Sequence, residues 1–257
     1  MYTVEYLVST MHQKDFSLIE RMNIKSDAII VNQCDRYEYH EIKNGNFTIK
    51  WFNVNEIGVS RSRNLAFSKA RADICLLVDD DEILEDECNL IISDAFAKNE
   101  KADLITFNVE TIKGNKKRYI NKEEKRLRVY NIMKYGAARI AFKRRVIEDA
   151  RILFAPNFGP GAKYTSGEDS LFLYDCLKKK IRCYSSPLYI AKIDDSEGSS
   201  SWFNGFTKEY FYNIGQLYRT MSPNFCWIYV LRYVILHRSR FKDVGLLNGI
   251  KLMLSRK

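Results

Sequence analysis

The sequence predicts an α/β fold in which a mostly parallel central sheet is flanked by helices on both faces. Short apolar runs of strand type alternate along the chain with segments of helical periodicity, which is the order found in parallel sheets with crossover helices. One run, at residues 74–78, is uncharged and rich in Leu, Val and Ile. Such a run is expected for a strand buried on both faces.

The expected elements follow one another from the N-terminus. Strands are predicted at 4–9, 28–31, 48–52, 74–78 and 103–109, and helices at 15–23, 60–70 and 87–98. The first helix is indicated by the helical spacing of Phe16, Ile19 and Met22, and Ser60 is the expected N-cap of the second. The polar residues between the second and third strands are interpreted as a loop, and the basic stretch 113–134 as a solvated loop or hairpin in preference to a phosphate site.

Composition narrows the class of protein. A chain of 257 residues with 46% hydrophobic and 13% aromatic residues can bury a full core, which excludes a disordered protein. The net charge of +9 favours a nucleic acid, an anionic membrane or a phosphorylated ligand as partner. Six scattered cysteines without a CxxC pair, and no signal peptide or spanning apolar run, indicate a cytoplasmic protein. A peripheral position on the inner face of the cell membrane is compatible with these features.

The expected strand at 74–78 ends in four consecutive acids, Asp79 to Glu82. Ligands bind where parallel strands end, and two carboxylates two residues apart lie on one side of an extended strand. Asp79 and Asp81 are therefore candidate ligands of a hard divalent cation that also needs phosphate oxygens. An equally good alternative is that these acids only begin a solvated helix, where negative charge suits the dipole.

A second cluster, at residues 156–170, contains three glycines and two prolines and leads into an expected helix that starts with Glu168 and Asp169. Glycine and proline permit tight turns and close approach to a ligand. A carboxylate held at such a helix start can accept a proton from an attacking hydroxyl. By itself, the pair is equally consistent with a simple helix cap.

A third cluster precedes the helix that leads into the acidic strand end. Its Arg63 offers a fork of donors that suits a phosphate or a nucleotide. An exposed arginine in a first helical turn is the alternative interpretation. Arg61 is expected to be a surface residue.

The order of these three clusters resembles family 2 glycosyltransferases of the GT-A fold, over residues 2–200. The resemblance implies a Rossmann-like domain that binds a nucleotide-sugar, with Mg²⁺ or Mn²⁺ joining the donor diphosphate to a DxD motif. It implies that Asp79 faces the nucleotide and the metal, that Asp81 is the principal metal ligand, and that Asp80 lies between them. It further implies that Asp169 is the catalytic base, supported by Glu168. In the same resemblance, Arg63 holds the nucleotide.

The sequence departs from the family where the base of the nucleotide is read. Many members end the second strand in two aspartates, whereas this chain has Asn32 and Gln33. Side-chain amides both donate to and accept from uracil, so these residues are candidates for the same role and a UDP-linked donor is expected. Thr10, after the first strand, is expected to line the base pocket. Asp194 and Asp195 lie where a further metal ligand would fall, although a solvated loop is favoured for them.

The remaining residues, 201–257, are expected to form a helical extension. Aromatic residues from Phe225 to Tyr229 precede a basic cluster from Arg232 to Lys242, as in helices that lie on anionic membranes. A core helix covering the sheet or the acceptor site is an equally good interpretation. Residues 197–203 are interpreted as either a flap or a linker.

These observations predict an inverting, metal-dependent glycosyltransferase. Its donor is a nucleotide-sugar, and its acceptor is the hydroxyl of a glycan or a lipid-linked oligosaccharide, as in capsule and other surface polysaccharide biosynthesis. The alternative is a non-catalytic basic module that binds membrane or nucleic acid. Such a module would explain the basic charge but not the placement of Asp79, Asp81 and Asp169, and nucleic acid is the less favoured partner.

Overall fold

The computed structural model describes residues 1–113, 118–194, 203 and 205–256. The strands are β1 Val4–Met11, β2 Asp27–Gln33, β3 Glu38–Asn44, β4 Phe47–Val54, β5 Ile74–Asp79, β6 Glu82–Leu84, β7 Leu104–Lys113, β8 Lys125–Arg126, β9 Ile140–Lys143 and β10 Cys183–Asp194. The α-helices are α1 Leu18–Arg21, α2 Val59–Lys69, α3 Cys88–Lys98, α4 Arg144–Asp149, α5 Glu168–Lys178, α6 Lys208–Met221, α7 Cys226–Leu236 and α8 Leu246–Leu254. Three short 3-10 helices are η1 Val129–Lys134, η2 Ala137–Arg139 and η3 Arg238–Phe241.

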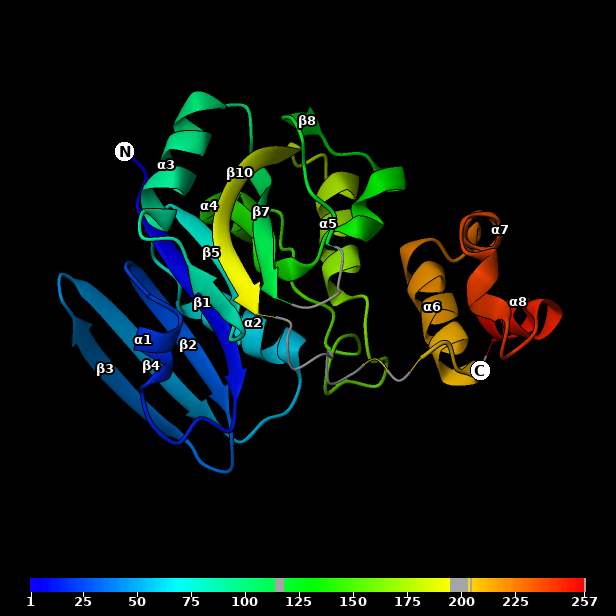
Figure 1. The fold of residues 1–257 in the computed structure, drawn as a ribbon, viewed down its shortest axis with the longest axis horizontal. Helices are drawn as coiled ribbons and strands as arrows, with labels where there is room; N and C mark the ends of the chain where they lie inside the picture. Colours follow the sequence, from blue (N-terminus) through cyan, green and yellow to red (C-terminus); the bar gives the residue numbers. More distant parts are fainter. Residues whose placement is uncertain (114–117, 195–202, 204, 257) are drawn as a thin grey trace.

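The strands form one mixed sheet in the order β3-β4-β2-β1-β5-β9-β7-β10-β6, and β8 pairs with β10 (Figure 1). The part from β4 through β2 and β1 to β5 is parallel, and β9 runs antiparallel between β5 and β7. The chain passes from β1 to β2 on one side and later returns to β5 on the other side of β1. The order of strands therefore reverses at β1, and in sheets of this kind ligands bind at such a reversal.

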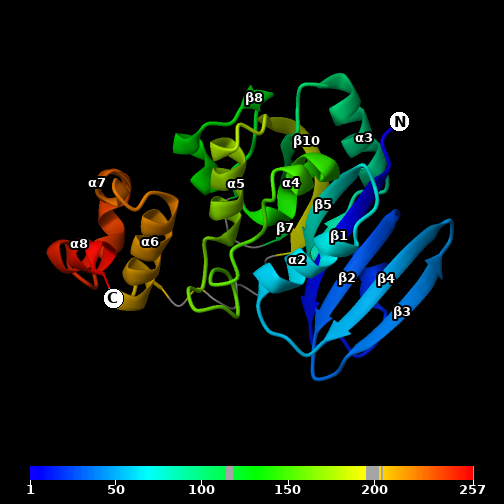
Figure 2. The ribbon, with the colours of Figure 1, turned by 180° about the vertical axis from the view of Figure 1, so that it is seen from behind.

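Two apolar layers cover the sheet, because alternate side chains of a strand point to opposite faces. In β1, Tyr6 and Val8 join the core beneath α1 and α3, whereas Leu7 joins the core beneath α2, α4 and α5. Figures 1 and 2 show these two helical layers from opposite sides. The predicted α/β class, with helices on both faces of the sheet, is confirmed.

The structure differs from the expected elements at four positions. The first predicted helix shortens to the single turn α1, and the polar stretch interpreted as a loop contains the antiparallel edge strand β3. Gly58 is the N-cap of α2, while Ser60 lies inside the helix and donates from Oγ to the carbonyl of Phe158 at 2.8 Å. The extended strand ends at Asp79, and Asp80 and Asp81 form a turn to β6, so the strand alternation assumed for Asp79 and Asp81 does not apply.

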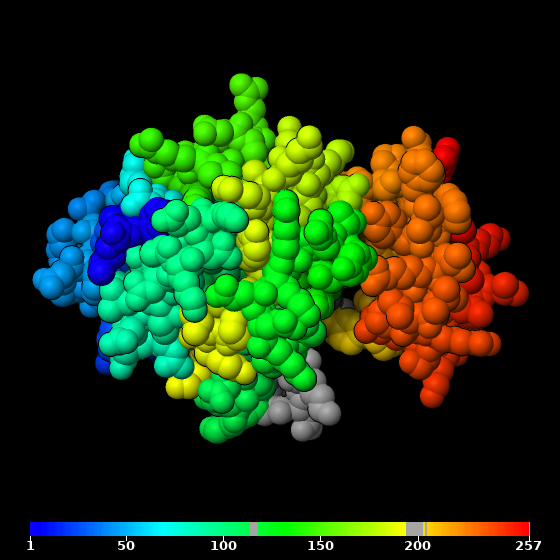
Figure 3. All heavy atoms as spheres, turned by 90° about the horizontal axis from the view of Figure 1, so that it is seen from above, coloured from blue at the N-terminus to red at the C-terminus, as the bar shows by residue number. Residues whose placement is uncertain are grey.

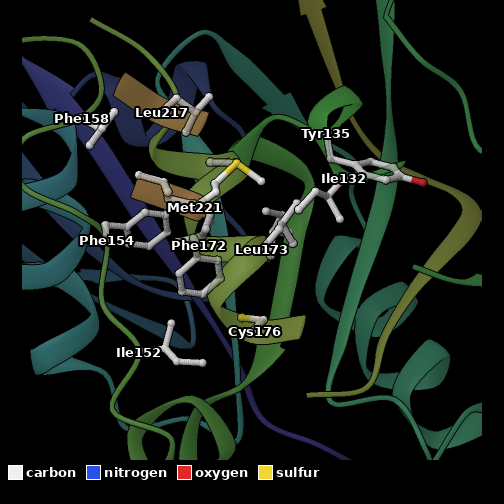
Figure 4. Packing of buried hydrophobic residues seen from close by; sticks show 14 of the residues in the cluster. Ile132, Tyr135, Ile152, Phe154, Phe158, Phe172, Leu173, Cys176, Leu217 and Met221 are labelled. Carbon is white, nitrogen blue, oxygen red and sulfur yellow. The ribbon is translucent and has the colours of Figure 1, made fainter. Parts of the chain in front are cut away.

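The C-terminal helices, α6, α7, η3 and α8, pack together and against α5. Leu217 and Met221 of α6 share the apolar core with Phe172 of α5, as Figure 4 shows. Gly215 allows α6 to approach α8 closely, because a Cβ there would lie 2.2 Å from the carbonyl oxygen of Met253. In Figure 3 these helices form a lobe at one end of the molecule.

The predicted domain division at residue 200 falls within 195–202, outside the described residues, and stays a prediction. Asp195 and nearly all of the segment 197–203 also lie outside them. Among the helices that are described, none has the length and apolar content needed to cross a bilayer.

Candidate active site

A pocket of about 940 Å³ lies at the carboxyl ends of the parallel strands. Residues 9–11 of β1, Gln33 of β2 and Asp79 of β5 line one side of it, and the opposite side is formed by the loop before α5 and by α6. Its volume is at the upper end of the range of small-molecule sites, roughly 300–1,000 Å³. The pocket therefore occupies the position that the strand order indicates.

Arg63 of α2 connects two acidic parts of the pocket. Its Nη2 donates to Oδ1 of Asp79 at 2.7 Å, and its Nη1 donates to Oε1 of Glu168 at 3.1 Å. The Arg63 side chain is only 4% exposed, which requires partners for its charge. Burial acts to lower the pKa of Arg63, but the carboxylates of Asp79 and Glu168 outweigh it and raise that pKa above its ordinary value. One guanidinium thus holds the end of β5 and the start of α5 together.

The loop before α5 is pressed against the N-terminus of α2. The backbone N–H of Val59 donates to the carbonyl of Pro160 at 3.1 Å. At Gly159, with φ +101°, a Cβ would lie 2.6 Å from Cγ1 of Val59 and 3.0 Å from Cδ of Glu168. Only glycine fits this position, because both its conformation and its space exclude a side chain. Gly159 therefore allows Val59 of α2 and Glu168 to approach each other this closely.

The acidic turn, Asp79 to Glu82, concentrates four carboxyl groups at the end of β5. Asp80 accepts a 2.5 Å hydrogen bond from the hydroxyl of Thr10. Burial and the charge of Asp79 raise the pKa of Asp81 to about 6, and the same two causes raise the pKa of Glu82. Crowded carboxylates of raised pKa are a favourable environment for a cation.

Asp169 is the second residue of α5 and lines the same pocket. Its Oδ1 accepts from the backbone N–H of Ser170 at 2.6 Å. Burial and the neighbouring charge of Glu168 raise the pKa of Asp169 to about 7, although Arg63 acts in the opposite direction. A carboxyl group of this pKa can take up a proton near neutral pH.

The residues predicted to read the nucleotide base lie at two depths. Thr10 and Gln33 line the pocket, where Gln33 accepts from the backbone N–H of Gly58 at 2.7 Å. Asn32 is fully buried outside the pocket lining, and its amide bonds to the backbone of Gln13 and to the side chain of Asn53. The structure thus brings together Thr10, Gln33, Arg63, Asp79, Asp80, Asp81, Glu168 and Asp169, but not Asn32. The roles of these residues stay predictions.

A group of basic residues in the pocket was not singled out from the sequence. Arg118, Lys134 and Arg139, here called the basic wall, line the pocket together with Tyr119. The guanidinium of Arg139 donates to the carbonyl of Tyr119 at 2.7 Å, and Nζ of Lys134 lies 3.6 Å from the ring centre of Tyr119. Part of the basic stretch interpreted as a solvated loop therefore faces the pocket. The high positive charge of the stretch 113–134 is the one sequence feature that points to Arg118 and Lys134, and no sequence feature points to Arg139.

The donor groups of the acidic turn fit a hard divalent cation. Asp79 and Asp81 offer carboxylate oxygens, which Mg²⁺ and Mn²⁺ prefer, and a cation would offset both causes of the raised pKa of Asp81, burial and the charge of Asp79. Within the described ranges, no three His, Cys, Asp or Glu side chains form a metal-binding group. A metal held by Asp79 and Asp81 would thus need further oxygen ligands from a bound diphosphate or from water.

Comparison with known proteins finds one family whose model matches part of the chain. Residues 26–151, which include Arg63 and the acidic turn but not Asp169, match the model of glycosyl transferase family 2. A comparison with curated proteins gave no match.

Solved structures of S. aureus TarS share the fold. The fragment 1–349 aligns with a TM-score of 0.65 at 12% identity, over 98% of this chain and 81% of that chain. The complex of this fragment with UDP-GlcNAc aligns with a TM-score of 0.63 at 14% identity, over 98% of this chain and 76% of that chain. A further TarS structure aligns with a TM-score of 0.62 at 15% identity, over 98% of this chain and 55% of that chain. The family match over residues 26–151 and the fold shared with TarS indicate a glycosyltransferase of the GT-A fold that is similar to family 2.

Proposed function

We propose that this glycosyltransferase is metal-dependent and transfers a sugar, with inversion, from a UDP-linked donor to a hydroxyl group. The acceptor is a glycan or a lipid-linked oligosaccharide of surface polysaccharide synthesis. Similar structures in complex with UDP and with UDP-GlcNAc support the choice of donor. A cytoplasmic location, peripheral to the membrane, belongs to the same proposal.

One observation carries the proposal. Asp169, with a pKa raised to about 7, lines the same pocket as the acidic turn, and Arg63 ties both regions together through Glu168 and Asp79. The buried guanidinium of Arg63 thus holds the proposed base and the proposed diphosphate-binding region in one pocket. Neither a structural helix cap nor a surface cation site requires this arrangement.

Asp169 accepts the proton of the acceptor hydroxyl as that oxygen attacks the anomeric carbon. With a pKa of about 7, the carboxyl is deprotonated in a large fraction of molecules at neutral pH, yet it is more basic than an ordinary aspartate. Glu168 is engaged with Arg63 at 3.1 Å, so it has a supporting role. Attack by the acceptor in one displacement breaks the bond between the anomeric carbon and the phosphate oxygen, releases UDP and inverts the anomeric centre.

The donor diphosphate lies between the acidic turn and the basic wall. When bound, Mg²⁺ or Mn²⁺ at Asp79 and Asp81 would stabilise the negative charge that develops on the diphosphate. Arg63 keeps Asp79 in position, and Thr10 fixes Asp80 by its hydrogen bond. Lys134 and Arg139 line the pocket and supply positive charge for the phosphate oxygens.

A thermal-shift measurement with UDP, with and without Mn²⁺, tests donor binding. Ligand at about one hundred times its dissociation constant stabilises by about 2.7 kcal/mol, which corresponds to about 5–10 °C for a chain of this size. Asp81→Asn should lose the Mn²⁺-dependent part of the shift. A chain that shows no shift with any nucleotide, but binds RNA in a salt-dependent manner, would be the alternative basic module.

A radiolabelled-donor assay tests the base. Asp169→Asn should reduce transfer by about 10²-fold to 10⁴-fold while leaving the UDP-dependent thermal shift intact. Asp175→Asn is the matched control, because Asp175 lies on α5 but does not line the pocket. Near wild-type transfer by Asp169→Asn would exclude Asp169 as the base.

A further inference from the structure

Helix α7 leaves a row of apolar side chains exposed. Trp227, Ile228, Leu231 and Ile235, here called the α7 stripe, are 54%, 47%, 54% and 70% exposed. Their spacing of one, four and eight residues from Trp227 places them on one face of the helix. Scattered exposed apolar residues are ordinary, but a continuous helical stripe indicates a binding surface.

The opposite face of α7 already provides the packing contacts of this helix. Cys226, Val230 and Tyr233 are buried in the core shared with α6 and α8. The helix carries a single charge, Arg232, among its eleven residues. A helix that is apolar on all sides is normally enclosed, so the α7 stripe requires an apolar partner outside this fold.

The charges around the α7 stripe indicate the nature of that partner. Residues 222–256 contain six Lys or Arg and a single acid, Asp243. Arg232 is exposed and lies one turn after Ile228, at the border of the stripe, and Arg238 and Lys242 follow as exposed residues of the next segment. A nucleic acid would match the charge but leave the apolar side chains in water. An anionic bilayer satisfies both, since its acyl chains accept the apolar side chains and its headgroups pair with the basic residues.

The geometry of α7 fits a helix that lies in the membrane interface. Eleven residues extend about 16 Å, roughly half of the hydrocarbon thickness of a bilayer. With one face packed on the protein, the other is free to enter the headgroup region to the depth of its side chains. Trp227, at the first turn, is of the residue type enriched at this depth.

We propose that the α7 stripe and its basic border, Arg232, Arg238 and Lys242, dock this protein on an anionic lipid bilayer. Docking would bring the end of the pocket that is formed by α6 near the membrane. Tyr210 of α6 lines the pocket, and its hydroxyl is 3.0 Å from that of Tyr233 on α7. This end of the pocket would then receive a lipid-linked acceptor, a consequence that rests on the proposed function.

Vesicle flotation with the full chain tests the docking surface. Wild type should float with vesicles of equal parts phosphatidylglycerol and phosphatidylcholine, and less with phosphatidylcholine alone or at high salt. The double variant Leu231→Gln, Ile235→Gln should lower the partition by about tenfold or more, because two apolar side chains no longer enter the bilayer. Arg232→Gln should lower it about fivefold, the equivalent of about 1 kcal/mol for one cation. Leu153→Gln is the matched control, since Leu153 is 57% exposed and lies outside the stripe.

Three outcomes would overturn the proposal. They are no flotation of wild type with the anionic vesicles, equal flotation of the double variant, and a concentration-dependent dimer in sedimentation that the double variant abolishes. The last would assign the stripe to a second copy of the chain. The UDP-dependent thermal shift separates this inference from the proposed function, because it should be identical in wild type and in the double variant. If wild type shows no UDP-dependent thermal shift but still floats with anionic vesicles, the donor assignment is refuted and the docking surface is not.

Discussion

Replacement of Arg63 tests whether the ion pairs with Glu168 and Asp79 hold the pocket together. Arg63→Met keeps most of the side-chain volume but leaves Glu168 and Asp79 without their shared partner. Removing one member of a buried ion pair costs about 3–5 kcal/mol. Glu168 is 9% exposed and keeps this cost, whereas Asp79 is 41% exposed and is largely screened by solvent. We therefore expect the free energy of unfolding of Arg63→Met to fall by about 3 kcal/mol, which lowers the melting temperature by about 6–12 °C.

The same replacement should change the pH dependence of transfer. Arg63 acts to lower the pKa of Asp169, so its removal raises that pKa further above about 7. Because the base works in its deprotonated form, the rising limb of activity should move to higher pH. Arg61→Met is the control, since Arg61 is an exposed neighbour on the same helix. The reasoning is refuted if Arg63→Met melts like Arg61→Met and shows the wild-type pH profile.

Three further predictions concern the pocket. Wild-type transfer should rise with pH through about 7 as Asp169 loses its proton; an activity that is flat from pH 5 to 9 would contradict this. The pKa of Asp81, raised to about 6, means that the folded state binds more protons than the unfolded state between pH 4 and 6, so stability falls as pH rises through this window. Asp81→Asn should therefore be the more stable protein at pH 8 and equal to wild type at pH 3.5 in denaturant titrations. Gly159→Ala should cost about 2–4 kcal/mol through strain and contact with Val59 and should reduce transfer, whereas Gly45→Ala, with nothing within 4 Å, should cost about 1 kcal/mol.

The buried strands could be predicted because their apolar runs have no other stable environment. Residues 74–78 are the first five residues of β5, and all five side chains are buried. The edge strand β3 could not, since its sequence, Glu38 to Asn44, has charged residues on the exposed face and pairs on one side only with β4. Such a strand is held by the hairpin and by its partner, which a local pattern does not show.

The candidate site was predictable where chemistry and position coincide. Acids directly after a buried strand, and a carboxylate pair after a glycine-rich loop, indicate a site by their place in the sequence alone. The basic wall was not predictable, because Arg139 comes from a short 3-10 helix whose place depends on the pairing of β9 with β5 and β7. Asn32 differs from the basic wall, because its amide could bind uracil by its chemistry but is already hydrogen-bonded to Gln13 and Asn53 inside the fold.

The contact between Gly167 and Leu217 links Asp169, the proposed base, to the C-terminal helices. A Cβ at Gly167 would lie 3.0 Å from Leu217, and α5, with Asp169 as its second residue, begins directly after this glycine. The turn that aims the base is therefore supported from outside by α6, which packs in turn on α7 and α8. Removing the C-terminal helices would take away this support and leave the base without a fixed direction. Helices α7 and α8, which do not line the pocket, thus contribute through α6 to the geometry of the site.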